Sequence, residues 1–186
     1  IEKHLETMAV CRCLGRPWAG IGPSGAGKTV LTAIFAALTN AERIRFNVSA
    51  GAQGRELLGG YGPIEENGEL RFRFIDGPAL EAGKKDQALL LLDECNLNQE
   101  AQLVVKSGVD RRAAVVHPES GEAISWKSVF LAATGNDVNA AGRKAFAPAF
   151  GDCLITSYVD NRPFEEQVEV VSSSCKLAES LIKDVA

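Results

Sequence analysis

Several residue types and patterns are scarce in this chain of 186 residues. No run approaches the roughly 20 consecutive apolar residues of a membrane span, and the first four residues lack the basic and apolar pattern of a secretory signal. Lysine and arginine, 20 together, are outnumbered by 24 aspartates and glutamates, so no overall basic field exists to attract nucleic acid or an anionic membrane. We therefore expect no direct contact with nucleic acid and none with a membrane.

Cysteine and histidine are also few. The five cysteines are odd in number and show neither the paired spacings of a disulfide framework nor those of a zinc site. The two histidines, His4 and His117, are far in sequence from any pair of cysteines. A reducing compartment and a site without a transition metal are the simpler expectations. The chain does not begin with methionine, which suggests a fragment of a longer protein.

What the chain does have is enough apolar residues, 46%, for one hydrophobic core. Helical spacing predicts a helix over residues 5–14, and the apolar, glycine-free run Lys28–Leu38 predicts a second helix that is mostly buried. Alternating or continuous apolar runs predict the strands of an α/β sheet with helices on both faces. These strands are expected at Trp18–Ile21 and at residues 43–48, 88–92, 128–133 and 155–159.

Two hairpins are predicted to project from the sheet. One contains residues 69–75 after Asn67-Gly68, and the other spans residues 113–126 and turns at residues 118–121. Apolar positions at roughly helical spacing over residues 163–186 predict a further helical segment. We therefore predict an α/β domain over residues 1–160 and the start of a helical segment over residues 161–186.

A complete Walker A pattern, G-x-x-x-x-G-K-[ST], lies between the first predicted strand and the helix Lys28–Leu38. The glycine-rich turn would curl its N–H groups around phosphate oxygens, Lys28 would reach the β and γ phosphates, and the Thr29 hydroxyl would bind Mg²⁺. A chance glycine loop is the alternative, which this strand and helix context disfavours. The predicted cofactor-binding residues are Gly22, Pro23, Ser24, Gly25, Ala26, Gly27, Lys28, Thr29 and, from the next motif, Asp93.

Asp93-Glu94 directly follows the apolar run at residues 88–92, which is the position of a Walker B motif. Ligands of open α/β sheets bind at the carboxyl ends of the strands. Asp93 would hold Mg²⁺ together with Thr29, and Glu94 would orient the water that attacks the γ-phosphate. Without the Walker A motif, the pair would be interpreted as an ordinary loop or helix cap.

Asn136 follows another predicted strand, residues 128–133, through Thr134-Gly135. It could place an amide beside the γ-phosphate and the attacking water, as a sensor residue. A turn-forming asparagine is the alternative. The catalytic residues predicted from these motifs are Glu94, Asn136 and Lys28.

With these three elements in order, the chain resembles the AAA+ ATPases. Further runs narrow the resemblance to the dynein-related branch, with midasin-like modules first and MoxR-like proteins next. The resemblance covers about residues 5–165 and is carried by residues 57–61 (LLGGY), 76–82 (DGPALEA), 91–97 (LLDECNL), 142–144 and 148–150.

The resemblance implies a P-loop NTPase fold with a three-layer αβα core and a parallel sheet of order 5-1-4-3-2. The two hairpins would be the helix-two insert and the pre-sensor-one hairpin, and residues 161–186 would begin an incomplete helical lid. The implied cofactors are ATP and Mg²⁺, and the implied partners are neighbouring AAA+ modules of a ring. A midasin-like module would remodel a protein of a pre-ribosomal particle in the nucleus, and other members of the branch would be cytoplasmic.

The chain departs from the family's pattern in two places. Gly151 and Cys153 stand where the resemblance leads one to expect arginines that include the arginine finger, and Arg143 or Arg162 could replace them. The segment after Asn98 lacks the leucine-rich helical sequence ending in Leu-Glu that the resemblance leads one to expect. Three functions stay open: an ATP-hydrolysing module of a ring remodeller, a nucleotide-stabilised structural module with little turnover, and a GTPase motor of a restriction system, for which no guanine pocket is marked.

Overall fold

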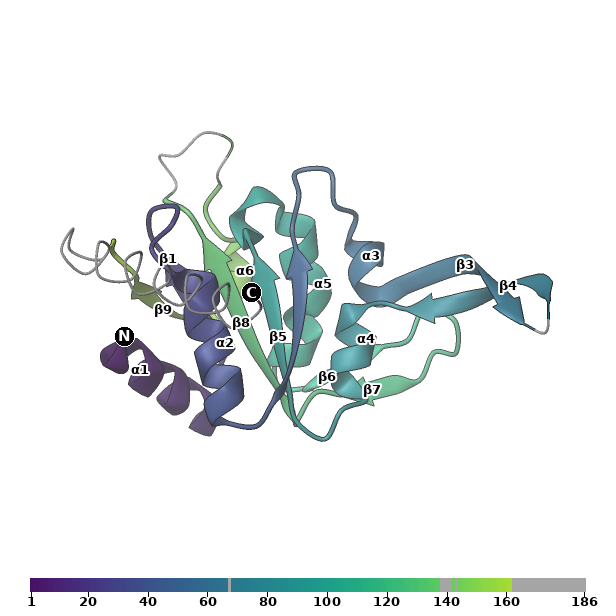
Figure 1. Cartoon of the computed structure of the whole chain (residues 1–186), viewed down its shortest axis with the longest axis horizontal. Helices are drawn as coiled ribbons and strands as arrows, with labels where there is room; N and C mark the ends of the chain where they lie inside the picture. Colours follow the sequence, from purple (N-terminus) through teal and green to yellow (C-terminus); the bar gives the residue numbers. More distant parts are fainter. Residues whose placement is uncertain (67, 138–141, 143, 162–186) are drawn as a thin grey trace, which may run out of the picture.

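The computed structural model describes residues 1–66, 68–137, 142 and 144–161. Its centre is a five-stranded sheet of order β2-β5-β8-β1-β9, in which every pair is parallel (Figure 1). Counted along the chain as five core strands, this is the predicted order 5-1-4-3-2, which is confirmed. The strands are β1 (Trp18–Ile21), β2 (Glu42–Asn47), β5 (Ala88–Asp93), β8 (Val129–Gly135) and β9 (Ile155–Tyr158).

Helices cover both faces of the sheet, so the three-layer architecture is also confirmed (Figure 1). One face carries α1 (Glu2–Cys13) and α2 (Lys28–Leu38). The other face carries α3 (Gly54–Leu58), α4 (Pro78–Gly83), η1 (Cys95–Leu97), α5 (Gln99–Val109) and α6 (Pro148–Gly151). In the described part of the chain no helix is long and apolar enough to cross a membrane. The predicted helical segment over residues 161–186 lies, apart from Asn161, outside the described residues.

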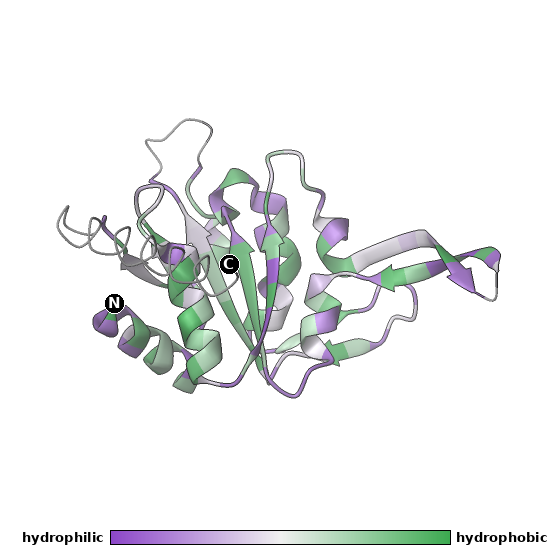
Figure 2. Cartoon of the chain, in the orientation of Figure 1, coloured by the Kyte–Doolittle hydropathy of each residue, from purple (hydrophilic) through white to green (hydrophobic). Residues whose placement is uncertain are grey.

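Strand β5 lies inside the sheet because its side chains are apolar on both faces. All six of its residues are buried, and Figure 2 shows the strand in the colours of apolar residues. Leu89 and Leu91 pack with α1 and α2, whereas Leu90 and Leu92 pack with the helices of the opposite face. A strand covered on both faces needs this continuous apolar run. Its carboxyl end therefore delivers Asp93 at the edge of a rigid core.

Helix α2 has the predicted bounds, but the expectation that it is mostly buried was wrong. Leu31, Phe35 and neighbouring positions face the sheet, whereas Val30 and Leu38 are 52% and 70% exposed. An outer helix of a three-layer fold has one side against the sheet and one side away from it. Helix α1 covers only part of that outer side, so apolar residues remain at the surface.

Both predicted hairpins are present. The long one, β3 (Gly59–Glu66) and β4 (Glu69–Asp76), extends far from the sheet between α3 and α4 (Figure 1). Its base is narrow because a Cβ at Gly59 would lie 2.1 Å from the carbonyl oxygen of Ile75, and one at Gly77 would lie 2.5 Å from that of Leu57. The short hairpin consists of β6 (Ala114–Val116) and β7 (Ala123–Ser125).

Four core strands differ from their predicted bounds by one or two residues; β5 ends one residue later than predicted, at Asp93, and β9 one residue earlier, at Tyr158. Strand β8 continues through Thr134 and Gly135 because these residues pair with Gly20 and Ile21 of β1. Strand β2 spans Glu42–Asn47, one residue earlier than the predicted 43–48. The extension of β8 matters for the site, because it brings Thr134 level with the end of β5.

Candidate nucleotide-binding site

The loop between β1 and α2 holds the predicted Walker A residues at the carboxyl edge of the sheet. Gly25 and Gly27 have φ angles of 83° and 88°, which side chains with a Cβ rarely adopt. A Cβ at Gly22 would lie 1.9 Å from the carbonyl oxygen of Val159. The local path of the loop thus requires glycine. Of the other loop residues, Ser24 is exposed, Pro23 is half-buried and Ala26 is buried.

The side chain of Lys28 lies inside the curve of this loop. Its Nζ donates hydrogen bonds to the carbonyl oxygens of Gly22, at 2.8 Å, and Pro23, at 2.6 Å. It also donates to Oδ1 of Asn136 at 3.1 Å. Lys28 is only 7% exposed, so its ammonium is held within the loop and beside the end of β8. An anion bound by the loop would meet a cation that is already oriented.

Thr29 and Asp93, the predicted metal ligands, are brought together from α2 and β5. The hydroxyl Oγ1 of Thr29 lies 3.1 Å from each carboxylate oxygen of Asp93. Asp93 is 4% exposed, and its Oδ1 also accepts a hydrogen bond from the hydroxyl of Thr134. Hydroxyl and carboxylate oxygens are hard donors of the kind that Mg²⁺ prefers. The donor chemistry at this point therefore fits Mg²⁺.

A third residue, Arg45, reaches the same carboxylate and was missed from the sequence. Its Nη2 lies 2.6 Å and its Nε 2.9 Å from Oδ2 of Asp93. The register of the parallel strands pairs Asn47 with Asp93, so the long side chain of Arg45 needs to span only two positions along β2. The sequence pattern predicts only that Arg45 is a polar position of an alternating strand. The pairing of β2 with β5, which is not local in sequence, gives it its partner.

Glu94 leaves the line of β5 in a sharp turn. Its backbone is left-handed, with φ of 59°, a conformation that costs a non-glycine residue about 1 kcal/mol or more. Its N–H donates to Oγ1 of Thr134 at 3.2 Å, and its Oε2 accepts from Nδ2 of Asn136 at 3.3 Å. The adjacent carboxylates are thereby separated, with Asp93 directed to Thr29 and Glu94 to Asn136.

Asn136 is fixed by the turn that follows the Walker B motif. Nδ2 of Asn96, in η1, donates to the backbone oxygen of Asn136 at 2.6 Å, and a Cβ at Gly135 would lie 2.9 Å from Cγ of Asn96. Asn136 is 8% exposed. Asn96 and Thr134 were not predicted as site residues. The sequence indicated their role only through their positions, because each lies within a few residues of a predicted site residue.

A small cleft lies beside the loop, on the side of α1 and β9. Its volume is about 70 Å³. Its lining joins the start of α2 to both described ends of the chain and consists of Ile1, His4, Ala26, Gly27, Val30, Leu31, Ile34, Val159 and Asp160. The lining is mostly apolar, and the cleft adjoins the loop that holds Lys28.

The segment at the opposite, amino edge of the sheet carries no arginine at the two expected places. Gly151 ends α6, and Cys153 is half-buried with its Sγ 3.6 Å from the carbonyl oxygen of Ala149. The guanidinium of Arg16 donates to the carbonyl oxygens of Asp152, at 2.7 Å, and Cys153, at 3.1 Å. The predicted replacements for the finger, Arg143 and Arg162, lie outside the described residues.

The fold and the site together define a class of protein. A parallel sheet of order 5-1-4-3-2, a glycine loop around a lysine after β1, and carboxylates after β5, which β8 separates from β1, are those of a P-loop NTPase of the AAA+ type. The family model "AAA domain (dynein-related subfamily)" matches residues 21–153. The chain therefore belongs to the dynein-related AAA family, a family of nucleotide-binding domains.

Relatives of unassigned function occur in staphylococci. A protein of Staphylococcus saprophyticus is 27% identical over 164 residues, which are 87% of this chain and 62% of that protein. A protein of Staphylococcus haemolyticus is 30% identical over 167 residues, 88% of this chain and 57% of its own length. The chain thus spans about three-fifths of the length of these relatives. Their bacterial origin gives no support to a role in ribosome assembly in a nucleus.

A solved structure has a similar fold. The crystal structure of a proposed ATPase from Cytophaga hutchinsonii superposes with a TM-score of 0.69 at 17% sequence identity. The superposition covers 92% of this chain and 49% of that protein. At this identity the likeness concerns the fold alone. It agrees with the three-layer architecture described above.

Proposed function

We propose that the chain is an ATP-hydrolysing module of an AAA+ ring. The observation that carries the proposal is the convergence of five side chains from three elements at one edge of the sheet. Lys28 and Thr29 come from the start of α2, Asp93 and Glu94 from the end of β5, and Asn136 from the end of β8. This is the set of groups that phosphoryl transfer to water requires.

The roles follow from the contacts of each side chain. Lys28 would neutralise the β and γ phosphates, because its ammonium already lies inside the loop. Glu94 would accept a hydrogen bond from the attacking water and orient it, and Asn136 would fix the direction of the Glu94 carboxylate. Thr29 and Asp93 would hold Mg²⁺, which when bound supplies neutralisation of the phosphate charge.

The choice of ATP over GTP follows from membership of the AAA family. The small cleft beside the loop does not select between the bases, because the one carboxylate of its described lining, Asp160, would accept a hydrogen bond from the amino group of either. Calorimetric titration with Mg·ATP and with Mg·GTP would test the choice, and tighter binding of Mg·GTP would overturn it.

We propose two alternatives for the larger assembly in which this module acts. A midasin-like module would act on a protein of a pre-ribosomal particle, whereas a MoxR-like module would act as a bacterial chaperone. The staphylococcal relatives favour the second. In either assembly, we expect neighbouring modules to complete the site.

A second candidate function is a nucleotide-stabilised module with little turnover. The observation that favours it is the absence of arginine at Gly151 and Cys153, which weakens the contribution of this chain to a neighbour but leaves its own Glu94 in place. The two candidates differ in turnover within an assembled ring.

The deciding experiment separates binding from hydrolysis. In assembled protein, Glu94→Gln should retain Mg·ATP binding and lose most turnover, because the amide accepts a water proton poorly. Asp93→Ala should lose binding that depends on Mg²⁺. Glu6→Gln, a matched change at an exposed position of α1, serves as the control. Parental turnover by the Glu94→Gln protein would exclude the proposed role of Glu94.

A further inference from the structure

The carboxylate of Asp93 is buried and has a cationic partner. Its side chain is 6% exposed, and the partner, the guanidinium of Arg45, approaches one oxygen through both Nη2 and Nε. A buried carboxylate without a counter-charge is costly. The two hydroxyls that also contact Asp93, from Thr29 and Thr134, are neutral. Among the described residues, Arg45 is therefore the one whose positive charge contacts the carboxylate of Asp93.

The same carboxylate is the one that would hold Mg²⁺ with Thr29. Arg45 and the metal would then act on one buried anion, and two cations at one carboxylate repel each other. The side chain of Arg45 is 51% exposed, so it can move toward solvent without breaking the core. Asp93 is anchored on β5 and cannot follow it.

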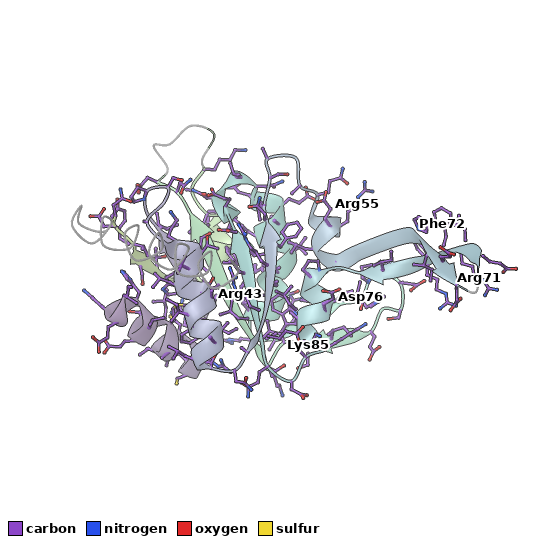
Figure 3. The ribbon with its side chains drawn as sticks, in the orientation of Figure 1. Arg43, Arg55, Arg71, Phe72, Asp76 and Lys85 are labelled. Atoms are coloured by element: carbon purple, nitrogen blue, oxygen red, sulfur yellow. The ribbon has the colours of Figure 1, made fainter. Side chains whose placement is uncertain are left out.

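A second arginine on the same strand makes a different contact. Arg43 lies two residues before Arg45, on the same side of β2, and its Nη2 is 3.4 Å from the carbonyl oxygen of Thr29. Burial, and secondarily the charge of Arg45, lowers the pKa of Arg43, whereas the charge of Asp93 acts in the opposite direction. Figure 3 shows Arg43 beside α2. Arg43 is thus a nearby cation with no described hydrogen bond to Asp93.

We propose that the guanidinium of Arg45 takes the place of Mg²⁺ before the metal binds. It neutralises and orients Asp93 in the absence of the metal, and it competes with Mg²⁺ for that carboxylate. The inference rests on the proposed function, because it takes Asp93 as a ligand of Mg²⁺. Arg45 is a positioning residue that acts through Asp93. Its consequence is a site that stays ordered without metal and that binds Mg²⁺ more weakly than it would without the competing guanidinium.

The test measures nucleotide binding at increasing Mg²⁺ concentration on the whole 186-residue chain. The Mg²⁺ concentration for half-maximal binding of ATP, followed by calorimetry, should fall about threefold to fivefold in Arg45→Gln, the range expected for a half-exposed ion pair. Arg45→Met should behave alike, because it also lacks the charge, and Arg45→Lys should stay close to the parental protein. Arg43→Gln is the matched control for the loss of a nearby charge and should shift the midpoint less.

A second measurement reports on the site without nucleotide. In EDTA, the Tm of Arg45→Gln should fall below that of the parental protein, and saturating Mg·ATP should reduce the difference. An unchanged or higher Mg²⁺ midpoint in both neutral variants would overturn the inference and leave the proposed function standing. An equal shift in Arg43→Gln would also overturn it. Failure of the parental chain to bind Mg·ATP would instead reject the proposed function.

Discussion

The side chain amide of Asn136 donates a hydrogen bond from Nδ2 to Oε2 of Glu94 across 3.3 Å. The two residues come from neighbouring strands, β8 and β5, so the sheet itself sets their separation. Because the other atom of the same amide, Oδ1, accepts from Nζ of Lys28, Asn136 joins the phosphate-binding lysine to the carboxylate that would orient water. A change at the phosphate would therefore act on Glu94 through the planar side-chain amide of Asn136.

This relationship predicts the effect of Asn136→Asp. An aspartate there would place a second negative charge against Glu94 and turn a donor into a repelling group. We expect turnover by the assembled protein to fall about tenfold to a hundredfold or more, and further than in Asn136→Ala. Steady-state hydrolysis and ATP affinity, measured on both variants, check this. Equal turnover in the two variants would show that the added negative charge does not act on Glu94, and parental turnover in Asn136→Ala would show that the donor function of Asn136 is unimportant.

Lys28→Ala should weaken Mg·ATP binding. The change removes a charge-assisted contact worth about 1.5–3 kcal/mol, because Lys28 is the buried cation of the loop. Calorimetry on the parental and variant proteins measures the loss. Lys127→Ala, at an exposed lysine near the amino end of β8, should bind as the parent does. Undiminished affinity in Lys28→Ala would reject the P-loop assignment.

The isolated chain should bind nucleotide but turn it over slowly. A finger arginine supplied by a neighbouring module contributes about 10³–10⁵ in rate to this class of reaction, and the family model matches a single AAA domain at residues 21–153. Single-turnover hydrolysis measured over a range of protein concentrations checks the expectation. Fast hydrolysis that does not depend on concentration, in a verified monomer, would contradict it.

Arginines placed at Gly151 and Cys153 should raise the ATPase rate of a neighbouring module about tenfold or more. The structure has room for the change, because a Cβ at Gly151 would meet only Cβ of Phe146, at an ordinary 3.7 Å. The double alanine variant is the control and should leave the neighbour's rate near its parental value. Loss of the neighbour's activity in the alanine variant would mean that this edge is already functional.

Asp76→Asn should weaken the base of the long hairpin in a way that depends on pH. Lys84, and to a lesser degree His117, lowers the pKa of Asp76 below 3.8. Stability from a lowered pKa is present above the unfolded value of about 3.8 and is lost as the pH falls through the folded value. At pH 7 the variant should lose about 1 kcal/mol of unfolding free energy.

Urea unfolding at pH 7 and at pH values below 3.8 measures this difference, which should shrink at the lower values. Asp86→Asn, at an exposed carboxylate before β5, is the control and should change little at either pH. A loss in Asp76→Asn that stays constant across the range would assign the effect to packing instead of charge.

The predictions that succeeded depended on local chemistry. The Walker A loop is specified by consecutive residues, and the burial of β5 follows from an apolar run that is continuous over five positions. The order of the sheet came from the resemblance to a family. The first arm of the long hairpin, β3, was not predicted as a strand because Gly59, Gly60, Gly62 and Pro63 are poor strand formers. Pairing with β4 overrides that preference.

The features that failed or were missed depend on contacts between distant segments. The exposed side of α2 could not be known without knowing which helix covers it. Arg45 is 48 residues from Asp93, and only the register of β2 against β5 reveals their contact. Thr134 lies at the site because β8 extends to Gly135, beyond the predicted end of the strand. Each of these outcomes is set by tertiary structure.

The narrow base of the long hairpin has a consequence for how this domain can diversify. Strands β3 and β4 leave and return at Gly59 and Gly77, whose backbones nearly touch. The inner part of the hairpin also contacts the short hairpin, through Tyr61 with Glu119 and Asp76 with His117. The outer part of the hairpin displays Phe72, which is 73% exposed, and Arg71 (Figure 3). We therefore expect a change of length confined to the outer part of the arm, beyond these contacts, to leave the three-layer body unchanged.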